Sequence, residues 1–197
     1  MASKARNIAD LLDSNGDVRA SSLDNAVSSW DGITGKPEYF AGRRNLIING
    51  GFDVWQRGTS FNSGYTADRW SLLGSINLTQ IAAETPYGKY GVRLPITDSK
   101  TGIAQYIEAV NCKHLAGKTV TVSVTGKVST GTIDAYVYYA NAEDNFSSYT
   151  YVNGGAVIDS ATTETGTISV TLPEQAVNGV MLYLYVNGLN ATADLIE

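Results

Sequence analysis

Residues 45–70 have the sequence NLIINGGFDVWQRGTSFNSGYTADRW, and they hold the densest cluster of structural signals in this 197-residue chain. Asn45–Ile48 predicts a short strand. The Asn-Gly-Gly sequence at 49–51 predicts a tight turn, because Asn and Gly tolerate left-handed backbone. Phe52 and Trp70 supply large apolar side chains of the kind that a folded domain buries. We therefore expect a folded domain to begin near residue 45.

After residue 70 the hydrophobic pattern has a period of two, which is typical of strands with one buried face. The clearest cases are Thr119–Lys127 and Val180–Val186. Further strand candidates are Arg69–Leu73, Ile76–Ile81, Tyr90–Leu94, Ala104–Ile107, Thr132–Tyr139 and Thr167–Thr171. The residues expected to be buried include Val120, Val122, Val124, Leu182 and Leu184. Short strands separated by turn signals, without helical crossovers, predict an all-β sandwich or barrel.

The composition excludes several classes of protein. Residues 1–44 carry six basic and six acidic residues, so the remaining eight basic and thirteen acidic residues give 45–197 a charge of −5. A surface that follows phosphates would be basic, which argues against nucleic-acid binding. No apolar run approaches the ~20 residues of a membrane span, and the N-terminus lacks a secretory apolar core. We therefore expect assembly in a cytoplasm.

The first 44 residues predict an attachment segment. Two short helices are expected, each with an apolar stripe at helical spacing. The residues of these stripes are Ile8, Leu12, Leu23, Val27 and Trp30. Residues 33–44 contain Gly and Pro and predict a linker. Helices of about ten residues are marginal alone, so the stripes need a partner. That partner is either another subunit or a different protein, or the sandwich of the same chain.

Classical catalytic groups are sparse. Cys112 and His114 are the sole residues of their types, so the chain has no internal disulfide and no cysteine zinc cage. We expect Cys112 to be a packed core residue and His114 to lie in a surface turn. Asp53, Asp68 and Glu108 are the carboxylates considered for glycosidase chemistry, but nothing in the sequence pairs any two of them. The sequence therefore argues against an enzyme.

Tyrosine is conspicuous, with twelve residues, and strand alternation places several on one outward face. Such a face suits stacking on sugars, packing within the domain, or contact between subunits. The adjoining segment 141–149 is expected to be a recognition loop, because it is polar and joins two aromatic strands. The candidate glycan-binding residues are Tyr136, Tyr138, Asn141, Glu143, Asp144, Asn145 and Tyr149. The sequence alone does not distinguish sugar binding, packing within the domain and contact between subunits.

Four motifs together carry a family resemblance. NLIINGGFDVWQRGTSF (45–61), YTADRW (65–70) and HLAGKTVTVSV (114–124) resemble the jelly-roll domain of many bacteriophage tail-fibre and related virion proteins. That domain is similar to the galactose-binding-like sandwiches of carbohydrate-binding modules. The segment SKARNIADLLDSNGDVRASSLDN (3–25) resembles the start of tail fibres. The resemblance covers most of the chain.

The resemblance implies a jelly-roll sandwich over 45–197, displayed on the virion and docked to other tail proteins through 1–44. It implies a homotrimer, adhesion to a host-surface polysaccharide without cleavage, and no cofactor beyond a structural calcium ion near Asp53. The alternative is a purely structural capsid-decorating or tail-adaptor protein. Such domains usually close with one more strand, and this chain stops at Glu197 within an apolar segment. We therefore expect the full gene product to be longer.

Overall fold

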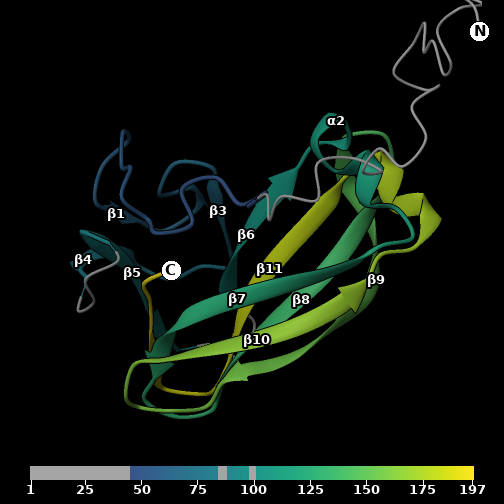
Figure 1. Cartoon of the computed structure of the whole chain (residues 1–197). Coiled ribbons are helices and arrows are strands. Elements are labelled where there is room, and N and C mark those ends of the chain that lie inside the picture. Colours follow the sequence, from purple (N-terminus) through teal and green to yellow (C-terminus); the bar gives the residue numbers. More distant parts are fainter. Residues whose placement is uncertain (1–44, 84–87, 98–100) are drawn as a thin grey trace, which may run out of the picture. The chain divides into compact units, whose positions relative to one another are not determined.

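The strands of the domain form two antiparallel sheets of six strands each (Figure 1). The structure is a computed structural model that describes residues 45–83, 88–97 and 101–197. The predicted helices of residues 1–44, with Ile8, Leu12, Leu23, Val27 and Trp30, lie outside the described residues. Asn45–Glu197 forms one compact unit. No helix within the described ranges is long and apolar enough to span a membrane.

Sheet I has the strand order β1-β4-β5-β12-β7-β10. Its strands are β1 (Ser60–Phe61), β4 (Leu78–Ala82), β5 (Tyr90–Ile96), β12 (Ala191–Leu195), β7 (Thr119–Val128) and β10 (Glu164–Thr171). Sheet II has the order β2-β3-β6-β11-β8-β9. Its strands are β2 (Gly64–Tyr65), β3 (Trp70–Leu73), β6 (Thr101–Ile107), β11 (Val180–Asn187), β8 (Thr132–Ala142) and β9 (Asn145–Ile158). Figure 1 shows β7 and β10 crossing over β8 and β11 as separate layers.

The predicted all-β sandwich is confirmed for the described residues, and its pattern of strands fits a jelly roll. The few short helical turns are α2 (Ala109–Cys112), η3 (Lys113–Leu115) and η4 (Glu174–Asn178). Cys112 is fully buried, as predicted, and burial raises the pKa of its thiol to about 11. His114 lies in η3, in the expected turn before β7.

The core lies between the sheets and is built from alternate residues of the strands. Val124, Leu182 and Leu184 are buried there, as predicted from the period of two. Val120 and Val122 are half-buried and pack against the same cluster. Each large side chain withdrawn from water contributes about 1.5–3 kcal/mol, so the sandwich depends on these inward faces.

Asn49 ties together the two ends of the 45–70 stretch. Its Nδ2 donates to the carbonyl oxygens of Val54 and Asp68, both at 3.0 Å, and its Oδ1 accepts from the Val54 amide at 3.0 Å. The indole Nε1 of Trp70 donates to the Asn49 carbonyl at 3.0 Å. The buried Trp70 ring packs on Phe52 with centroids 5.1 Å apart. This network explains why the motif marks the start of the domain.

The prediction of a strand at Asn45–Ile48 is wrong. These residues are irregular, and the turn at 48–51 follows directly. The buried side chain of Gln105 replaces a neighbouring strand, because its Oε1 accepts from the Ile48 amide at 2.7 Å and its Nε2 donates to the Ile48 carbonyl at 2.9 Å. A side-chain amide thus satisfies the backbone groups that a β-ladder would otherwise satisfy.

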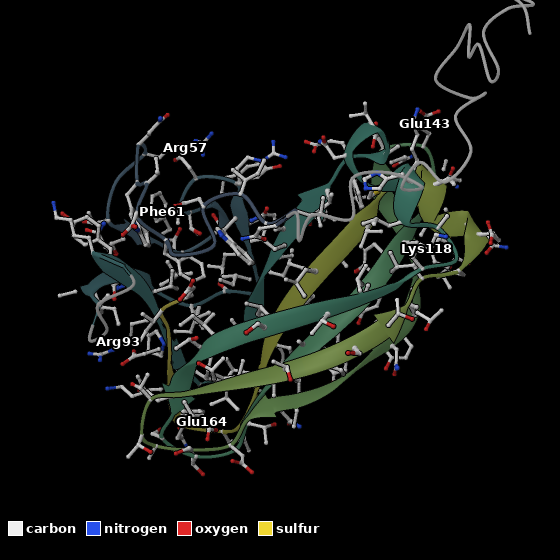
Figure 2. All side chains as sticks on the ribbon, in the orientation of Figure 1. Arg57, Phe61, Arg93, Lys118, Glu143 and Glu164 are labelled. Atoms are coloured by element: carbon white, nitrogen blue, oxygen red, sulfur yellow. The ribbon has the colours of Figure 1, made fainter. Side chains whose placement is uncertain are left out.

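The prediction of a long loop at 141–149 is also wrong. β8 and β9 form a hairpin in which Ala142 pairs with Asn145, so the turn consists of two residues, Glu143 and Asp144. Asp144 has φ of 52°, a left-handed conformation that aspartate tolerates in turns. Figure 2 shows Glu143 at the end of the sandwich that carries α2, and Glu164 at the opposite end.

Candidate functional site

The outer face of sheet II carries a continuous group of tyrosines. Strands β6, β11, β8 and β9 lie side by side, and their inward residues belong to the core. The alternating residues point the other way. We call this surface the tyrosine face, made of Tyr106, Tyr136, Tyr138, Tyr149, Tyr151, Tyr183 and Tyr185. The face draws on residues 79 positions apart in sequence, which the sheet brings together.

The rings of this face contact one another. Ring centroids are 6.0 Å apart for Tyr136 and Tyr151, 5.6 Å for Tyr138 and Tyr151, and 5.2 Å for Tyr138 and Tyr149. Tyr185 links Tyr136 to Tyr183, at 5.9 and 5.8 Å. Edge-on and tilted pairs at these separations are favourable by about 0.5–1.5 kcal/mol each. The result is a broad aromatic surface with limited freedom of its side chains.

Two of the tyrosines are well exposed. Tyr149 is 45% exposed and Tyr151 is 50% exposed. Tyr136, Tyr138 and Tyr183 are half-buried, and burial raises the pKa of Tyr183 above its usual range. The exposed pair on β9 therefore offers ring area to a ligand, while the half-buried rings hold that pair in place.

Glycines make room for the half-buried rings. Gly154 pairs with Tyr136 across β8 and β9, and a Cβ atom on Gly154 would lie 2.4 Å from Tyr136 Cδ1. Gly102 pairs with Tyr185, and a Cβ there would lie 2.9 Å from Tyr183 Cε2. Because real Cβ atoms do not come so close, the absence of side chains at these two positions lets the rings lie against the backbone.

A buried carboxylate lies beneath one end of the tyrosine face. Asp134 is only 4% exposed, and it is an outward residue of β8. Its Oδ2 accepts from the Tyr136 hydroxyl at 2.8 Å, and its Oδ1 accepts from the Thr132 hydroxyl at 2.6 Å. The bond to Asp134 is the main reason that the pKa of Tyr136 is raised to about 12.

The structure brings Tyr136, Tyr138 and Tyr149 together, but it gives the polar residues of 141–149 other contacts. Asn141 donates to Ser148 Oγ at 2.7 Å and accepts from Thr150 Oγ1 at 2.6 Å. Asn145 accepts from the amide and the hydroxyl of Ser147. These amides hold the hairpin together.

Asp144 fastens the hairpin turn to the neighbouring helical turns. Its Oδ1 accepts from the Ala109 amide at 2.6 Å, and its own amide donates to the Asn178 carbonyl at 2.9 Å. Glu143, beside it, is exposed. The ring of Phe146 packs on Tyr106 with centroids 4.8 Å apart, and it closes this end of the tyrosine face.

Sequence reasoning omitted several residues of this site from the candidates. Tyr151 is the most exposed ring of the face, and it falls in β9, for which the sequence pattern predicts no bounds. Asp134 was placed on the tyrosine side of β8, but its burial and its hydroxyl partners were not foreseen. Residues two apart in a strand share a face, so the sequence places Thr132, Asp134 and Tyr136 on the same side of β8. This spacing is the signal that predicts contacts among the three side chains.

The carboxylates considered for catalysis serve structural contacts. Asp68 Oδ1 accepts from the Gln56 amide at 3.2 Å and lies 3.9 Å from Arg57. Glu108 pairs with Arg69 at 2.6 Å, and that hydrogen bond holds the pKa of Glu108 below its usual range. Both carboxylates therefore fix loop geometry around the start of β3.

Asp53, the residue near which a structural calcium ion was considered, accepts hydrogen bonds from the backbone. Its Oδ1 accepts from the backbone amides of Lys89 and Tyr90, at 2.7 and 3.2 Å. Calcium needs six to eight oxygen ligands, usually with several carboxylates. The described part of the chain contains no group of three or more His, Cys, Asp or Glu side chains that could hold a metal ion. Asp53 is thus a hydrogen-bonding residue of the first loop.

The outer face of sheet I differs in character. Its hydroxyl side chains pair across β7 and β10, with Oγ–Oγ distances of 2.9 Å for Thr119 and Thr171 and 2.8 Å for Thr125 and Thr165. These hydroxyls satisfy one another, whereas the tyrosine face presents ring area. The tyrosine face is therefore the stronger candidate for recognition.

Solved structures that share this fold include the following three. A family 16 carbohydrate-binding module has a TM-score of 0.51 and 16% identity, over 78% of this chain and 96% of that one. A putative sugar-binding protein from Bacteroides thetaiotaomicron VPI-5482 has a TM-score of 0.54 and 10% identity, over 78% and 97%. The enzymatically active domain of tailspike protein 4 of bacteriophage CBA120 has a TM-score of 0.52 and 13% identity, over 77% of this chain and 20% of that one.

At these identities the likeness establishes the fold: the domain is a β-sandwich of the type found in carbohydrate-binding modules. The chain matches no protein-family model and no curated protein sequence.

Proposed function

We propose that residues 45–197 bind a glycan of the bacterial surface through the tyrosine face, as part of a bacteriophage tail-fibre subunit. The observation that carries this proposal is the group of seven tyrosines across four adjacent strands, six of them linked by ring contacts, with Tyr149 and Tyr151 exposed. Flat rings stack on the C–H faces of sugars, and phenol hydroxyls bond to sugar hydroxyls. The folds of the carbohydrate-binding module and the sugar-binding protein support the same use.

Binding without cleavage fits the roles of the carboxylates. Glycoside hydrolysis needs two carboxyl groups about 5–10 Å apart at the scissile bond. Asp68 and Glu108 are engaged with arginines, and Asp53 accepts two backbone amides. Each of these three carboxylates holds a loop in place. In this proposal the domain is therefore an adhesin that binds its glycan without cleaving it.

The tail-fibre role is supported by the sequence motifs of 3–25, 45–70 and 114–124, and by the shared fold of a phage tailspike domain. In this role residues 1–44 dock the subunit onto other tail proteins and hold a homotrimer together. The stripes that would form these contacts are Ile8, Leu12, Leu23, Val27 and Trp30. The protein would then reside in the tail appendage of a virion assembled in the host cytoplasm.

A structural role is the second candidate, as a capsid-decorating or tail-adaptor protein. Tyrosine is enriched in protein interfaces as well as in sugar sites, so the same exposed pair, Tyr149 and Tyr151, favours this reading too. In that case the tyrosine face would contact another virion protein.

Substitution of Tyr151 by alanine distinguishes the two candidates. We expect Tyr151→Ala in the full chain to weaken adsorption to host cells and binding on a glycan array by about tenfold or more, because an exposed ring is lost without opening a cavity. Thr167→Ala, at an exposed position of β10, is the matched control and should bind normally. Unchanged adsorption with loss of the protein from particles would favour the structural role.

Deletion of residues 1–32 tests the docking role. We expect the shortened protein to keep its sandwich, to sediment as a monomer, and to be absent from particles. If it still forms trimers, the sandwich holds the assembly and the N-terminal segment serves docking alone. A monomeric full-length protein, both free and on the particle, would refute the trimer.

A further inference from the structure

The tyrosine face contains one carboxylate whose surroundings are unusual. Asp134 is almost completely buried on the tyrosine side of β8, and its hydrogen-bond partners are the hydroxyls of Thr132 and Tyr136. Buried carboxylates are normally paired with cations or with several amides. Here the partners are two groups that can each either donate or accept a hydrogen bond.

An ionised carboxylate accepts hydrogen bonds and cannot donate them, so both hydroxyl protons must point toward Asp134. Each hydroxyl has a single proton. Once that proton is used, the oxygen of Tyr136 or Thr132 can offer only lone pairs to another molecule. The carboxylate therefore turns two ambivalent hydroxyls into acceptors. Both residues remain partly accessible to solvent.

These acceptors lie next to the exposed ring area. The Tyr136 ring is 6.0 Å from that of Tyr151, centroid to centroid. A sugar stacked on Tyr151 would therefore lie next to the ring whose hydroxyl donates to Asp134. The negative charge of Asp134 lies beneath the same place, and residues 45–197 carry a net charge of −5. Anionic substituents would be repelled there, by an amount that grows as water is excluded.

We infer that Asp134 sets the hydrogen-bonding polarity of the tyrosine face and thereby its specificity: it selects sugar units that offer hydroxyl, amide or ammonium donors and rejects units that carry carboxylate or phosphate. This inference rests on the proposed glycan binding and adds the chemical class of the ligand. Asp134 is a positioning residue, because it acts through the hydroxyls of Tyr136 and Thr132.

The informative variant is Asp134→Asn, which keeps the shape of the side chain. The asparagine removes the charge, and its Nδ2 donates to one of the two hydroxyls, whose own proton then becomes available to the ligand. The matched control is Asp159→Asn, which removes an exposed carboxylate from the segment between β9 and β10. Circular dichroism and thermal unfolding of both variants would verify that they fold.

The first experiment uses a glycan array in which each oligosaccharide is printed as a matched set of the neutral sugar, its uronic acid and its amino sugar. We expect the full-length protein to bind the acidic member about tenfold more weakly than the neutral member, and Asp134→Asn to reduce that gap to about twofold. Equal binding of acidic and neutral members overturns the inference while leaving glycan binding intact. No binding to any sugar overturns both.

The second experiment needs no ligand. Tyrosines labelled with carbon-13 at the ring carbon that bears the hydroxyl are titrated by NMR, and Tyr136→Phe identifies the Tyr136 signal. We expect Asp134→Asn to lower the pKa of Tyr136 from about 12 toward its ordinary value near 10, and Asp159→Asn to leave it unchanged. An unchanged pKa in Asp134→Asn shows that Tyr136 does not donate to Asp134, and overturns the inference even if the domain binds glycans.

Discussion

Tyr136 and Gly154 face each other across β8 and β9, and the ring of the tyrosine occupies the space that a side chain at Gly154 would need. The ring is therefore held against the backbone of the neighbouring strand. This contact fixes a central residue of the site, because the Tyr136 ring packs on Tyr151 and the Tyr136 hydroxyl donates to Asp134.

Alanine at the two glycines of β9 should have opposite effects. Gly154→Ala places a methyl group 2.4 Å from Tyr136 Cδ1, and we expect a loss of about 1–3 kcal/mol in the free energy of unfolding. Gly155→Ala meets nothing within 4 Å, and it should be neutral or slightly stabilising because it restricts the unfolded chain. Urea denaturation measures both, and equal effects would refute the contact.

Alkaline pH should destabilise the domain in a defined window. The folded pKa of Cys112 is about 11 against 9.0 in the unfolded chain, and that of Tyr136 is about 12 against 10.0. Both groups are held neutral by the fold, so their contribution is complete below pH 9 and is lost as pH rises to 12. Urea midpoints measured from pH 8 to 12 should fall, and Cys112→Ala should flatten the curve between pH 9 and 11.

Asn49 should be among the most sensitive residues of the first loop. Asn49→Ala removes three hydrogen bonds and puts a Cβ-bearing residue without a polar side chain at φ of 55°, so we expect a loss of about 3 kcal/mol. Asn49→Gly relieves the backbone strain and should recover about 1 kcal/mol of the lost free energy of unfolding. Thermal unfolding separates the two contributions. A glycine variant as stable as the wild type would mean that the hydrogen bonds contribute nothing.

The ion pair between Arg93 and Asp194 should respond asymmetrically to mutation. Asp194 is buried and receives two hydrogen bonds from Arg93, at 2.7 and 2.8 Å, with Lys127 3.8 Å away. Arg93→Ala removes two hydrogen bonds from a buried carboxylate that keeps Lys127 nearby, and it should cost about 1–3 kcal/mol. Asp194→Ala leaves Arg93, which already reaches water, and should cost less. Chemical denaturation at neutral pH compares the two variants, and the reverse order would contradict this assignment.

Calcium should not alter the stability of residues 45–197. Asp53 Oδ1 already accepts two backbone amides, so removal of the ion by a chelator has no ligand set to disrupt. We expect the same Tm in EDTA and in millimolar calcium. A rise in Tm with calcium that Asp53→Ala abolishes would establish a calcium site built mainly from backbone carbonyls.

The sequence predicted the buried strands better than the exposed ones. Thr119–Lys127 and Val180–Val186 alternate cleanly because one face of each packs on the core, and both are strands within a residue or so of the predicted bounds. The bounds of β9 could not be predicted because most of its residues are exposed and Gly154 and Gly155 interrupt it, so its pairing with β8 determines its conformation. A strand with few buried residues lacks the alternation of apolar and polar residues by which strands are predicted.

The candidate site could be predicted in part for the same reason. The outward direction of Tyr136 and Tyr138 follows from their buried neighbours on β8. The hairpin turn at Glu143 and Asp144 does not, because the contact of Asp144 with Ala109 joins residues 35 positions apart. The burial of Asp134 likewise depends on rings from other strands, which local sequence does not specify.

The positions of β11 and β12 within the sheets bear on how the polypeptide folds during synthesis. β11 lies between β6 and β8, and β12 lies between β5 and β7, yet these are the last two strands in sequence order. A nascent chain that has not yet released Val180–Leu195 from the ribosome cannot join the two halves of either sheet. Until then four strands expose unpaired edges, which are prone to association with other chains. The two sheets can therefore be completed only after β11 and β12 have been synthesised.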